Sequence, residues 1–279
     1  MALVVNTNMN ALTIENSLTN TNNSVSSSLQ KLASGLRINS AKDDPAGHAI
    51  ANAFKAAISS MTVASQNANQ AQSMLQTADG AYSQINDILV QMKSLATEAA
   101  SGQQTSQNLN SLNGEFAKLQ GEIDKIAQST QYGSTSLING TGNAVSGITF
   151  QVGATNVGSN QIIVTFDGAT TGCLAVGTST VGIGSLTSAQ AAMDAIDSAL
   201  TSINSYMGNV GAFQNQLQYT VNNLTTSIQN YTSSESTIAD VDMASEVSNL
   251  TKNEILQQSA TAMLAQANSQ PQQILKLLQ

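Results

Sequence analysis

The sequence feature that most constrains the fold is a seven-residue repeat between Ile50 and Ala99. Alternate steps of four and three residues from Ile50 meet an apolar side chain every time, and the hydroxyl of Tyr82 is the single polar atom. This spacing keeps one narrow seam of a helix against a partner helix. No proline interrupts it, and Gly80 is the one helix-weakening residue. Such a helix would be roughly 75 Å long, so it needs a long partner.

Two further repeats supply that partner. A long one runs from Leu186 to Tyr231, with Gln214 as its polar interruption, and a shorter one runs from Leu109 to Ile126. Since the loop at 101–107 is short, the shorter helix is expected to lie antiparallel to the first. The sequence therefore predicts a mainly α fold of long antiparallel, coiled-coil-like helical rods.

The composition changes between residues 133 and 184. This segment holds more than half of the 19 glycines and a single charged residue, Asp167. Apolar residues alternate with period two at 148–152 and at 162–166, which indicates short strands. We expect a small β-hairpin insertion at the tip of the rods.

Both ends of the chain carry weaker seams. Near the N-terminus the three–four steps fall on Ala11, Ile14, Leu18, Thr21, Val25, Ser28, Leu32 and Gly35; near the C-terminus they fall on Leu256, Ala260, Met263 and Ala267. Pro271 is expected to interrupt the second seam. The two ends can pair as a coiled coil, yet seams this thin are not satisfied by one partner. The residues assigned to polymerisation are Leu18, Val25, Leu32, Leu256, Met263 and Leu277.

Charged breaks join these ends to the rods. Gly35 can end the first helix, Asp44 followed by Pro45 is a typical helix start, and Asp242 can cap the last helix. The residues assigned to this inter-domain break are Arg37, Lys42, Asp43, Asp44, Pro45, Asp240 and Asp242. The expected domains are a terminal coiled-coil domain of 1–44 with 240–279, and a rod domain of 45–239 with its β-rich tip at 133–184.

Charge and apolar content exclude several classes of protein. Only 9% of residues are charged, against about 25% in an average protein. Lys and Arg are scattered singly and the net charge is −8, so nucleic acid binding is disfavoured. No apolar run approaches the length of a membrane span. The first residues do not resemble a cleaved secretory signal, so we expect any export to use another route. Low charge also lets identical copies approach closely.

Catalytic groups are scarce. His48 is the one histidine, so no metal site that needs two or more histidines can be built. Asp43 and Asp44 are adjacent, and helix capping explains them better than acid–base chemistry. Cys173 fits a reactive exposed thiol and a small buried apolar residue equally well. We expect neither an enzyme nor a cofactor.

The break also carries a family resemblance. LASGLRINSAKDDPAGHAIAN, residues 32–52, resembles the N-terminal signature of bacterial flagellins. The start MALVVNTNMNAL, the segments TQYGSTSLINGT and ITFQVGATN, and the end from IADVDMASEV onward match in the same order. The resemblance implies a short flagellin without large outer domains, whose ends form the inner coiled coil.

That family membership would imply function and partners. The chain would self-assemble into the flagellar filament, the helical propeller for swimming, after unfolded export through the flagellar type III apparatus. The implied partners are other copies of the chain, the flagellar cap, the hook-associated junction proteins and an export chaperone. The implied location is extracellular.

The resemblance also implies a receptor site. Toll-like receptor 5 contacts a patch that falls here on Gln91, Leu95 and Glu115, with Lys93 nearby. Leu95 and Glu115 match the recognised pattern, whereas Gln91 stands where strongly recognised flagellins have arginine. Replacing arginine by glutamine loses a permanently charged bidentate donor. We therefore expect weakened recognition.

Two other functions remain open from the sequence. The hook–filament junction protein shares the terminal signatures, but the short insertion disfavours it. A surface adhesin would act through the uncharged, Ser- and Thr-rich segment 133–184. Electron microscopy of the purified protein distinguishes the three, because only the first forms long uniform filaments.

Overall fold

The computed structural model describes residues 8–178 and 181–277, with the side chains of 143 and 271–277 left out. The elements in chain order are α1 (Met9–Ser34), α2 (Pro45–Ala99), α3 (Ser106–Ser129), β1 (Gln131–Tyr132), β2 (Thr135–Ser136), α4 (Asn143–Ser146), β3 (Ile148–Gln151), a 3-10 turn (Gly158–Asn160), β4 (Gln161–Val164), α5 (Leu186–Ala239) and α6 (Met243–Leu277). The mainly helical fold with long rods is confirmed, and the expected small β-hairpin (β3–β4) is present together with a second one (β1–β2).

Contacts divide the chain into two compact units, described separately below. The central unit comprises Ser59–Ile228, and the terminal unit comprises the described residues up to Ile58 and from Gln229 onward. The long helices α2 and α5 contribute to both units. The division expected at 44/45 and 239/240 stays a prediction.

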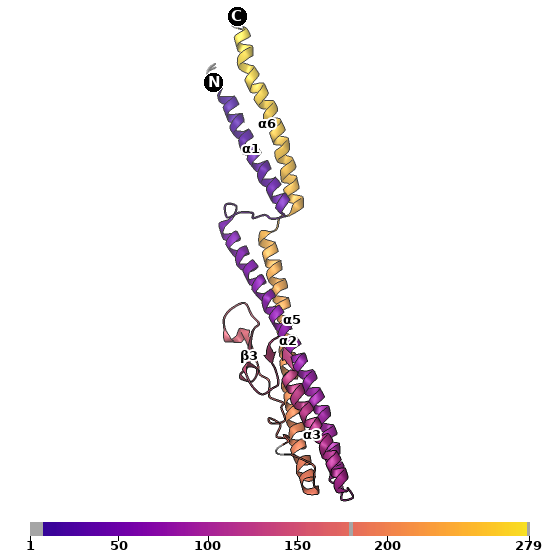
Figure 1. The fold of residues 1–279 in the computed structure, drawn as a ribbon. Helices are drawn as coiled ribbons and strands as arrows, with labels where there is room; N and C mark the ends of the chain where they lie inside the picture. The colour runs from indigo at the N-terminus through magenta and orange to yellow at the C-terminus, as the bar shows by residue number, and fades with distance from the viewer. Residues whose placement is uncertain (1–7, 179–180, 278–279) are drawn as a thin grey trace. The chain divides into compact units, whose positions relative to one another are not determined.

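In the central unit, α2, α3 and α5 pack around one apolar core (Figure 1). The repeat positions of α2 are all buried there, namely Met61, Ala64, Ala68, Ala71, Leu75, Ala78, Tyr82, Ile85, Leu89, Met92, Ala96 and Ala99. The alternate positions of the α5 repeat from Ala189 to Leu217 are buried as well. The prediction that two further helices cover the long seam is confirmed from Met61 to Ala99, whereas its first position, Ile50, is 47% exposed. The ring centroids of Tyr82 on α2 and Tyr206 on α5 lie 5.9 Å apart, so these two side chains belong to the contact between the two helices.

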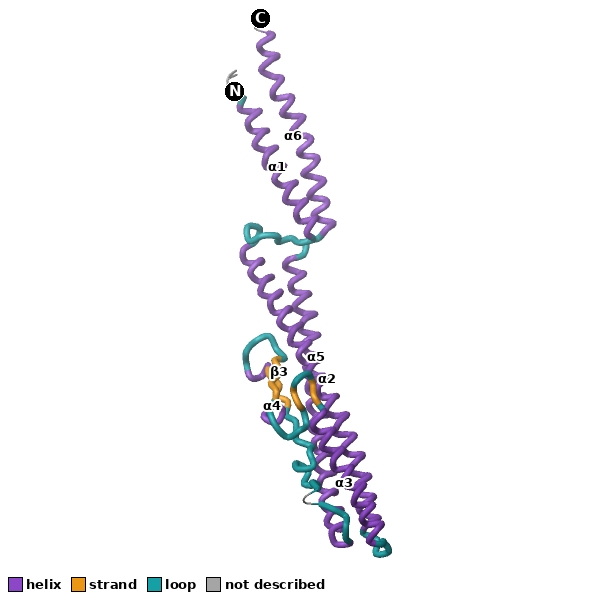
Figure 2. The backbone as a smooth tube through the Cα atoms, viewed as in Figure 1, coloured by secondary structure: helices purple, strands orange, loops and turns teal. Residues whose placement is uncertain are grey.

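The β segment of the central unit contains two antiparallel hairpins (Figure 2). Strands β3 and β4 pair with Ile148 opposite Val164 and Gln151 opposite Gln161. The alternating apolar residues form these strands, as predicted, although Val152 and Phe166 lie just beyond the strand ends and are buried there.

Polar side chains of α3 hold the extended chain that follows β4. Gln120 is buried, and its Nε2 donates to the carbonyls of Val176 and Val181 at 2.6 and 3.0 Å. The Asp124 carboxylate accepts from the backbone N–H and the hydroxyl of Thr171 at 2.8 and 2.9 Å. The Asn113 side chain accepts from the N–H of Ile183. Since these residues are spaced by seven and four, they share one face of the helix.

Tyr82 anchors the same segment from α2. Its hydroxyl donates to the Asp167 carbonyl at 2.6 Å, and the side chain is buried. Burial raises the pKa of Tyr82 well above its usual value, with a smaller contribution from the charge of Asp167. The hydroxyl therefore keeps its proton and remains a donor across the physiological pH range.

In the terminal unit, α1 and α6 lie side by side and antiparallel (Figure 1). Two hydrogen bonds join them: Asn8 Nδ2 to the Ala267 carbonyl at 2.9 Å, and Gln257 Nε2 to Asn22 Oδ1 at 2.7 Å. All the N-terminal seam positions from Ala11 to Gly35 are half-buried or buried, which confirms that repeat. The expected interruption at Pro271 is wrong, because α6 continues through it to Leu277.

Candidate assembly site

The break between the terminal helices and the rods is a junction held by hydrogen bonds within the terminal unit. The N–H of Arg37 donates to the Ala239 carbonyl at 2.6 Å, and the N–H of Val241 donates to the Gly35 carbonyl at 3.0 Å. The Arg37 guanidinium donates to the last carbonyls of α5, at Ile238 (2.6 Å) and Thr237 (3.3 Å). A cation at a helix C-terminus also favours the helix dipole. Arg37 therefore fastens the chain leaving α1 to the end of α5.

Gly35 permits the turn into this junction. It has φ of +71°, a left-handed conformation that glycine adopts without strain, and its N–H closes α1 on the Lys31 carbonyl. The helix end was predicted from the glycine, and the structure confirms it.

The carboxylates of the break cap helices and turns. Asp44 accepts from the N–H groups of Ala46 and Gly47 at the start of α2, and Asp242 accepts from those of Ala244 and Ser245 at the start of α6. Pro45 is the first residue of α2. Both predicted caps are therefore present, and each carboxylate neutralises the positive end of a helix.

The remaining acidic residues of the break, Asp43 and Asp240, accept hydrogen bonds from groups close to them in the sequence. Asp43 accepts from the backbone N–H groups of Asn39 and Ser40 and from the Ser40 hydroxyl. These bonds, with that to the Ser40 backbone largest, lower the pKa of Asp43. Asp240 accepts from the Ser236 hydroxyl at 2.6 Å, and Lys42 is exposed. The break is thus an ordered loop in which acidic side chains bind backbone donors.

Large apolar side chains remain exposed on both terminal helices. They are Met9, Leu12 and Leu29 on α1, and Met243, Val247, Ile255, Leu256 and Met263 on α6. The described ionic side chains of these two helices are Glu15, Lys31, Glu246, Lys252 and Glu254. Few charges therefore oppose a second apolar surface that would cover these side chains.

The residues assigned to polymerisation divide between two environments. Leu18, Val25 and Leu32 are half-buried in the pairing of α1 with α6. Leu256 and Met263 are 47% and 57% exposed, and the side chain of Leu277 lies outside the described residues. The C-terminal seam expected at Leu256, Ala260, Met263 and Ala267 is therefore wrong in part, because Leu256 and Met263 lie off the face of α6 that packs on α1.

The face of α6 that packs on α1 runs through other positions of the helix. Its less exposed positions are Leu250, Asn253, Gln257, Ala260, Leu264 and Ala267, again spaced by three and four. Several of these are small or polar, whereas larger apolar residues lie on the other faces. A groove of about 300 Å³ follows the pair, lined by Asn10, Thr13, Ile14, Met263, Gln266, Ala267 and Gln270.

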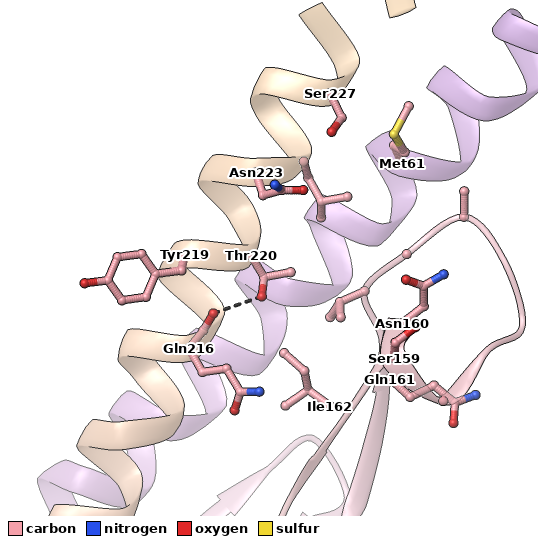
Figure 3. Close-up of a pocket in the computed structure, with 15 residues that line it drawn as sticks. Met61, Ser159, Asn160, Gln161, Ile162, Gln216, Tyr219, Thr220, Asn223 and Ser227 are labelled. Atoms are coloured by element: carbon pink, nitrogen blue, oxygen red, sulfur yellow. Dashed lines mark hydrogen bonds between the residues drawn. The ribbon is translucent and has the colours of Figure 1, made fainter. Parts of the chain in front are cut away.

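The central unit has a larger groove between the tip of the β3–β4 hairpin and α5 (Figure 3). Its volume is about 770 Å³, and its lining includes Met61, Asn160, Gln216 and Asn223. None of the lining side chains is a carboxylate, amine, imidazole or thiol. Tyr219 is 76% exposed and its ring turns away from the hairpin. The lining therefore places no carboxylate, imidazole or amine beside its hydroxyl groups to activate them as nucleophiles.

The four receptor candidates lie on the surface of the central unit. Gln91 and Glu115 are exposed, on α2 and α3 respectively. Lys93 forms an ion pair with Asp197 of α5. Leu95 is half-buried and packs against the core. Asp197 was not singled out in the sequence, because no spacing rule connects residues 104 positions apart.

Four further features of the described residues bear on the predictions from the sequence, namely metal-ligand clusters, membrane-spanning helices, His48 and Cys173. Among residues 8–178 and 181–277, no three His, Cys, Asp or Glu side chains gather as metal ligands would. Within the same residues, no helix has the length and apolar character that a bilayer span requires. His48 contacts Asn52 one turn along α2. Cys173 is a free cysteine and the residue is exposed, so the buried alternative is wrong, while its reactivity stays a prediction.

Family models match both ends of the chain. The bacterial flagellin N-terminal helical region matches residues 5–143, and the bacterial flagellin C-terminal helical region matches residues 193–278. The flagellin of Xenorhabdus nematophila is 41% identical over 154 residues, which cover 55% of this chain and 48% of that protein. The flagellin of Salmonella muenchen is 40% identical over 154 residues, covering 55% and 30%. The chain spans half or less of these relatives' length.

One solved structure shares the fold. A structure described as a flagellar hook-associated protein from Vibrio parahaemolyticus aligns with a TM-score of 0.58 at 13% identity, over 70% of this chain and 99% of that one. At this identity the likeness concerns the fold alone. The crystal structure of Bacillus cereus flagellin is 28% identical, with a TM-score of 0.49 over 57% of this chain and 88% of that one.

Proposed function

Because the chain belongs to the bacterial flagellin family, we propose that it is a structural subunit that self-assembles into the flagellar filament, the helical propeller for swimming. The observation that carries the proposal is the open apolar surface of the terminal helix pair, where Ile255, Leu256 and Met263 have no covering partner in the described chain. The role proposed is structural and non-enzymatic.

Assembly would draw on burial of these side chains. Fully burying a large apolar side chain is worth about 1.5–3 kcal/mol, so a half-exposed one contributes about 1 kcal/mol. The eight exposed residues of α1 and α6 then supply a free energy comparable with the ~4–15 kcal/mol cost of association. Assembly should therefore depend on concentration and on several neighbours at once. Open head-to-tail contacts of this kind generate helical polymers.

Deletion of residues 240–279 tests the role of the ends. We expect the deletion to abolish polymerisation, because it removes α6 and most of the exposed apolar side chains. The central unit should stay folded, since its core lies within Ser59–Ile228. Electron microscopy and sedimentation at rising concentration measure polymerisation, and circular dichroism measures folding. Filaments formed by the deleted chain would contradict the proposal.

A point variant tests the exposed surface more finely. The double substitution Leu256→Gln with Met263→Gln should raise the concentration needed for polymerisation without unfolding the chain, because both side chains are exposed. Gln258→Asn is the matched control, an exposed position on the same helix that loses no apolar group. Short stubs or rings formed by the unmodified chain would favour the junction protein. Monomers at every concentration would favour the adhesin.

We also propose weak recognition by Toll-like receptor 5 through Gln91, Leu95 and Glu115. The exposed positions of Gln91 and Glu115 support it, and the pairing of Lys93 with Asp197 reduces the charge that Lys93 offers. Gln91→Arg should strengthen activation in a receptor reporter cell, while Gln76→Arg, an exposed control on the same helix, should not. Full activation by the unmodified chain would contradict weakened recognition.

The remaining proposals concern export and partners. We propose an extracellular location after type III export, with an export chaperone, the flagellar cap and the hook-associated junction proteins as partners. Expression in strains with and without the flagellar export apparatus tests this. Release into the medium that does not depend on the apparatus would contradict it.

A further inference from the structure

The carbonyl of Ala267 in α6 has lost its helical partner. In an α-helix that carbonyl accepts from the N–H four residues later. Position 271 is a proline, which has no N–H, yet α6 runs through it to Leu277. Ala267 is buried, so its carbonyl needs a donor from elsewhere.

Asn8 supplies that donor from the other helix. Its Nδ2 donates to the Ala267 carbonyl at 2.9 Å, and its Oδ1 accepts from the N–H of Ala11 at 3.1 Å. One amide therefore caps α1 and completes α6 at the same time. Aspartate could perform the capping, but an ionised carboxylate has no hydrogen to donate.

The seam between the two helices specifies their register weakly by packing. Its members include Ala11, Thr21 and Ser28 on α1, and Asn253 and Ala260 on α6. Small and polar side chains of this kind fit several alignments of a three–four repeat. In coiled coils, single buried polar contacts select one alignment among such choices.

We propose that Asn8 is a positioning residue for assembly, which fixes the register of α1 and α6 by binding the carbonyl that Pro271 leaves free. The register decides which apolar side chains the pair presents together: Met263 lies beside Ile14 in the groove along the pair. A slip of one helical turn moves these residues apart by about 5 Å. The consequence for assembly rests on the proposed filament function. The hydrogen bond from Asn8 to Ala267 that fixes the register, called the lock below, joins two helices of one chain and does not depend on that function.

A double-mutant cycle in the full-length chain tests the lock. Asn8→Asp keeps the cap and removes the donor, whereas Pro271→Ala restores the backbone N–H to Ala267. We expect Asn8→Asp alone to raise the critical concentration for polymerisation about tenfold, the effect of one lost buried hydrogen bond. In the Pro271→Ala background the same change should cost less than about twofold. Asn23→Asp, an exposed position on α1, is the control for added charge.

The register of α1 and α6 can be measured directly as a distance, which tests the lock independently of polymerisation. Spin labels at Asn16→Cys and Thr261→Cys, both exposed, report the distance between α1 and α6 in a Cys173→Ser background. The distance is measured on the monomer, and on polymer in which labelled chains are diluted with unlabelled ones. We expect a narrow distribution that Asn8→Asp shifts or broadens and Pro271→Ala restores.

The outcomes are distinguishable. An unchanged distribution in Asn8→Asp, no rescue by Pro271→Ala, or a broad distribution in the unmodified chain in both states would overturn the lock. A chain that never polymerises but shows the narrow distribution and its rescue would overturn the filament function and leave the lock standing.

Discussion

The seam of α2 in the central unit and the seams of α1 and α6 in the terminal unit follow the same three–four spacing but end in different states. Every repeat position of α2 from Met61 to Ala99 is buried, because α3, α5 and the β segment all contribute to its cover. Among the described residues the terminal helices pack mainly on each other, and large apolar side chains remain exposed on both. The spacing therefore specifies a helix face, while the number of covering elements decides whether that face is closed.

The largest expected effect compares one substitution in both seams. Leu89→Ala should lower the free energy of unfolding by about 2–5 kcal/mol, because Leu89 is fully buried and leaves a cavity. Leu256→Ala should change it by about 0.5 kcal/mol or less, because that side chain is half-exposed. Urea unfolding followed by circular dichroism measures both.

For polymerisation, measured under conditions in which both variants are folded, the order of the two effects should be the opposite. Leu256→Ala should impair polymerisation more than Leu89→Ala does, since only the former removes exposed apolar surface. Equal losses of stability, or unimpaired polymerisation of Leu256→Ala, would break the comparison between a closed and an open seam.

A smaller effect is expected at Gln120, which closes the central unit through polar contacts. Gln120→Ala leaves the carbonyls of Val176 and Val181 without their side-chain donor and should cost about 1–3 kcal/mol of unfolding free energy. Hydrogen exchange in the segment 170–178 should also accelerate. Gln128→Ala, an exposed position on the same helix, should have little effect. Similar values for the two variants would show that packing alone holds this segment.

The smallest effect is expected at Asp43, in the loop that joins α1 to α2. Three hydrogen bonds to its carboxylate lower its pKa, so its contribution is present above the ordinary carboxyl pKa of about 4. That contribution is lost as the pH falls through the lowered value. The loop 38–44 should then be cleaved faster by an acid protease.

The substitution Asp43→Asn should give the faster cleavage already at pH 7, where a protease active at neutral pH replaces the acid protease, and it should remove the pH dependence. Asp87→Asn, an exposed carboxylate on α2, serves as the control. A pH dependence that persists in Asp43→Asn would assign the effect to another group.

Local patterns predicted much of the fold, because helix faces and caps are encoded over a few residues. The seam of α2, the helix starts at Asp44 and Asp242, and the short strands all follow from neighbours in the sequence. Polar contacts between distant residues could not be predicted in this way. Gln120 reaches carbonyls 56 and 61 residues away, and Asn8 reaches one 259 residues away. An asparagine before an apolar repeat indicates a cap, but nothing in it indicates a second role.

Pro271 illustrates how an expectation from the sequence can be wrong. Proline disrupts a helix by removing a donor and crowding the preceding turn, and the sequence rule assumes that the lost hydrogen bond stays lost. The Asn8 amide replaces the donor from outside the helix, so α6 continues. Rules for isolated helices fail where a neighbouring helix supplies the missing group.

The backbone bridge at Leu36 and Asp240 has a mechanical consequence. Its two segments run antiparallel, so α1 and α6 leave it from the same side. Tension applied equally to both helices displaces the two segments together and leaves the hydrogen bonds unsheared. Tension on one helix alone loads the bonds from Arg37 and Val241 in shear. The junction therefore shares an uneven pull between the two ends of the chain.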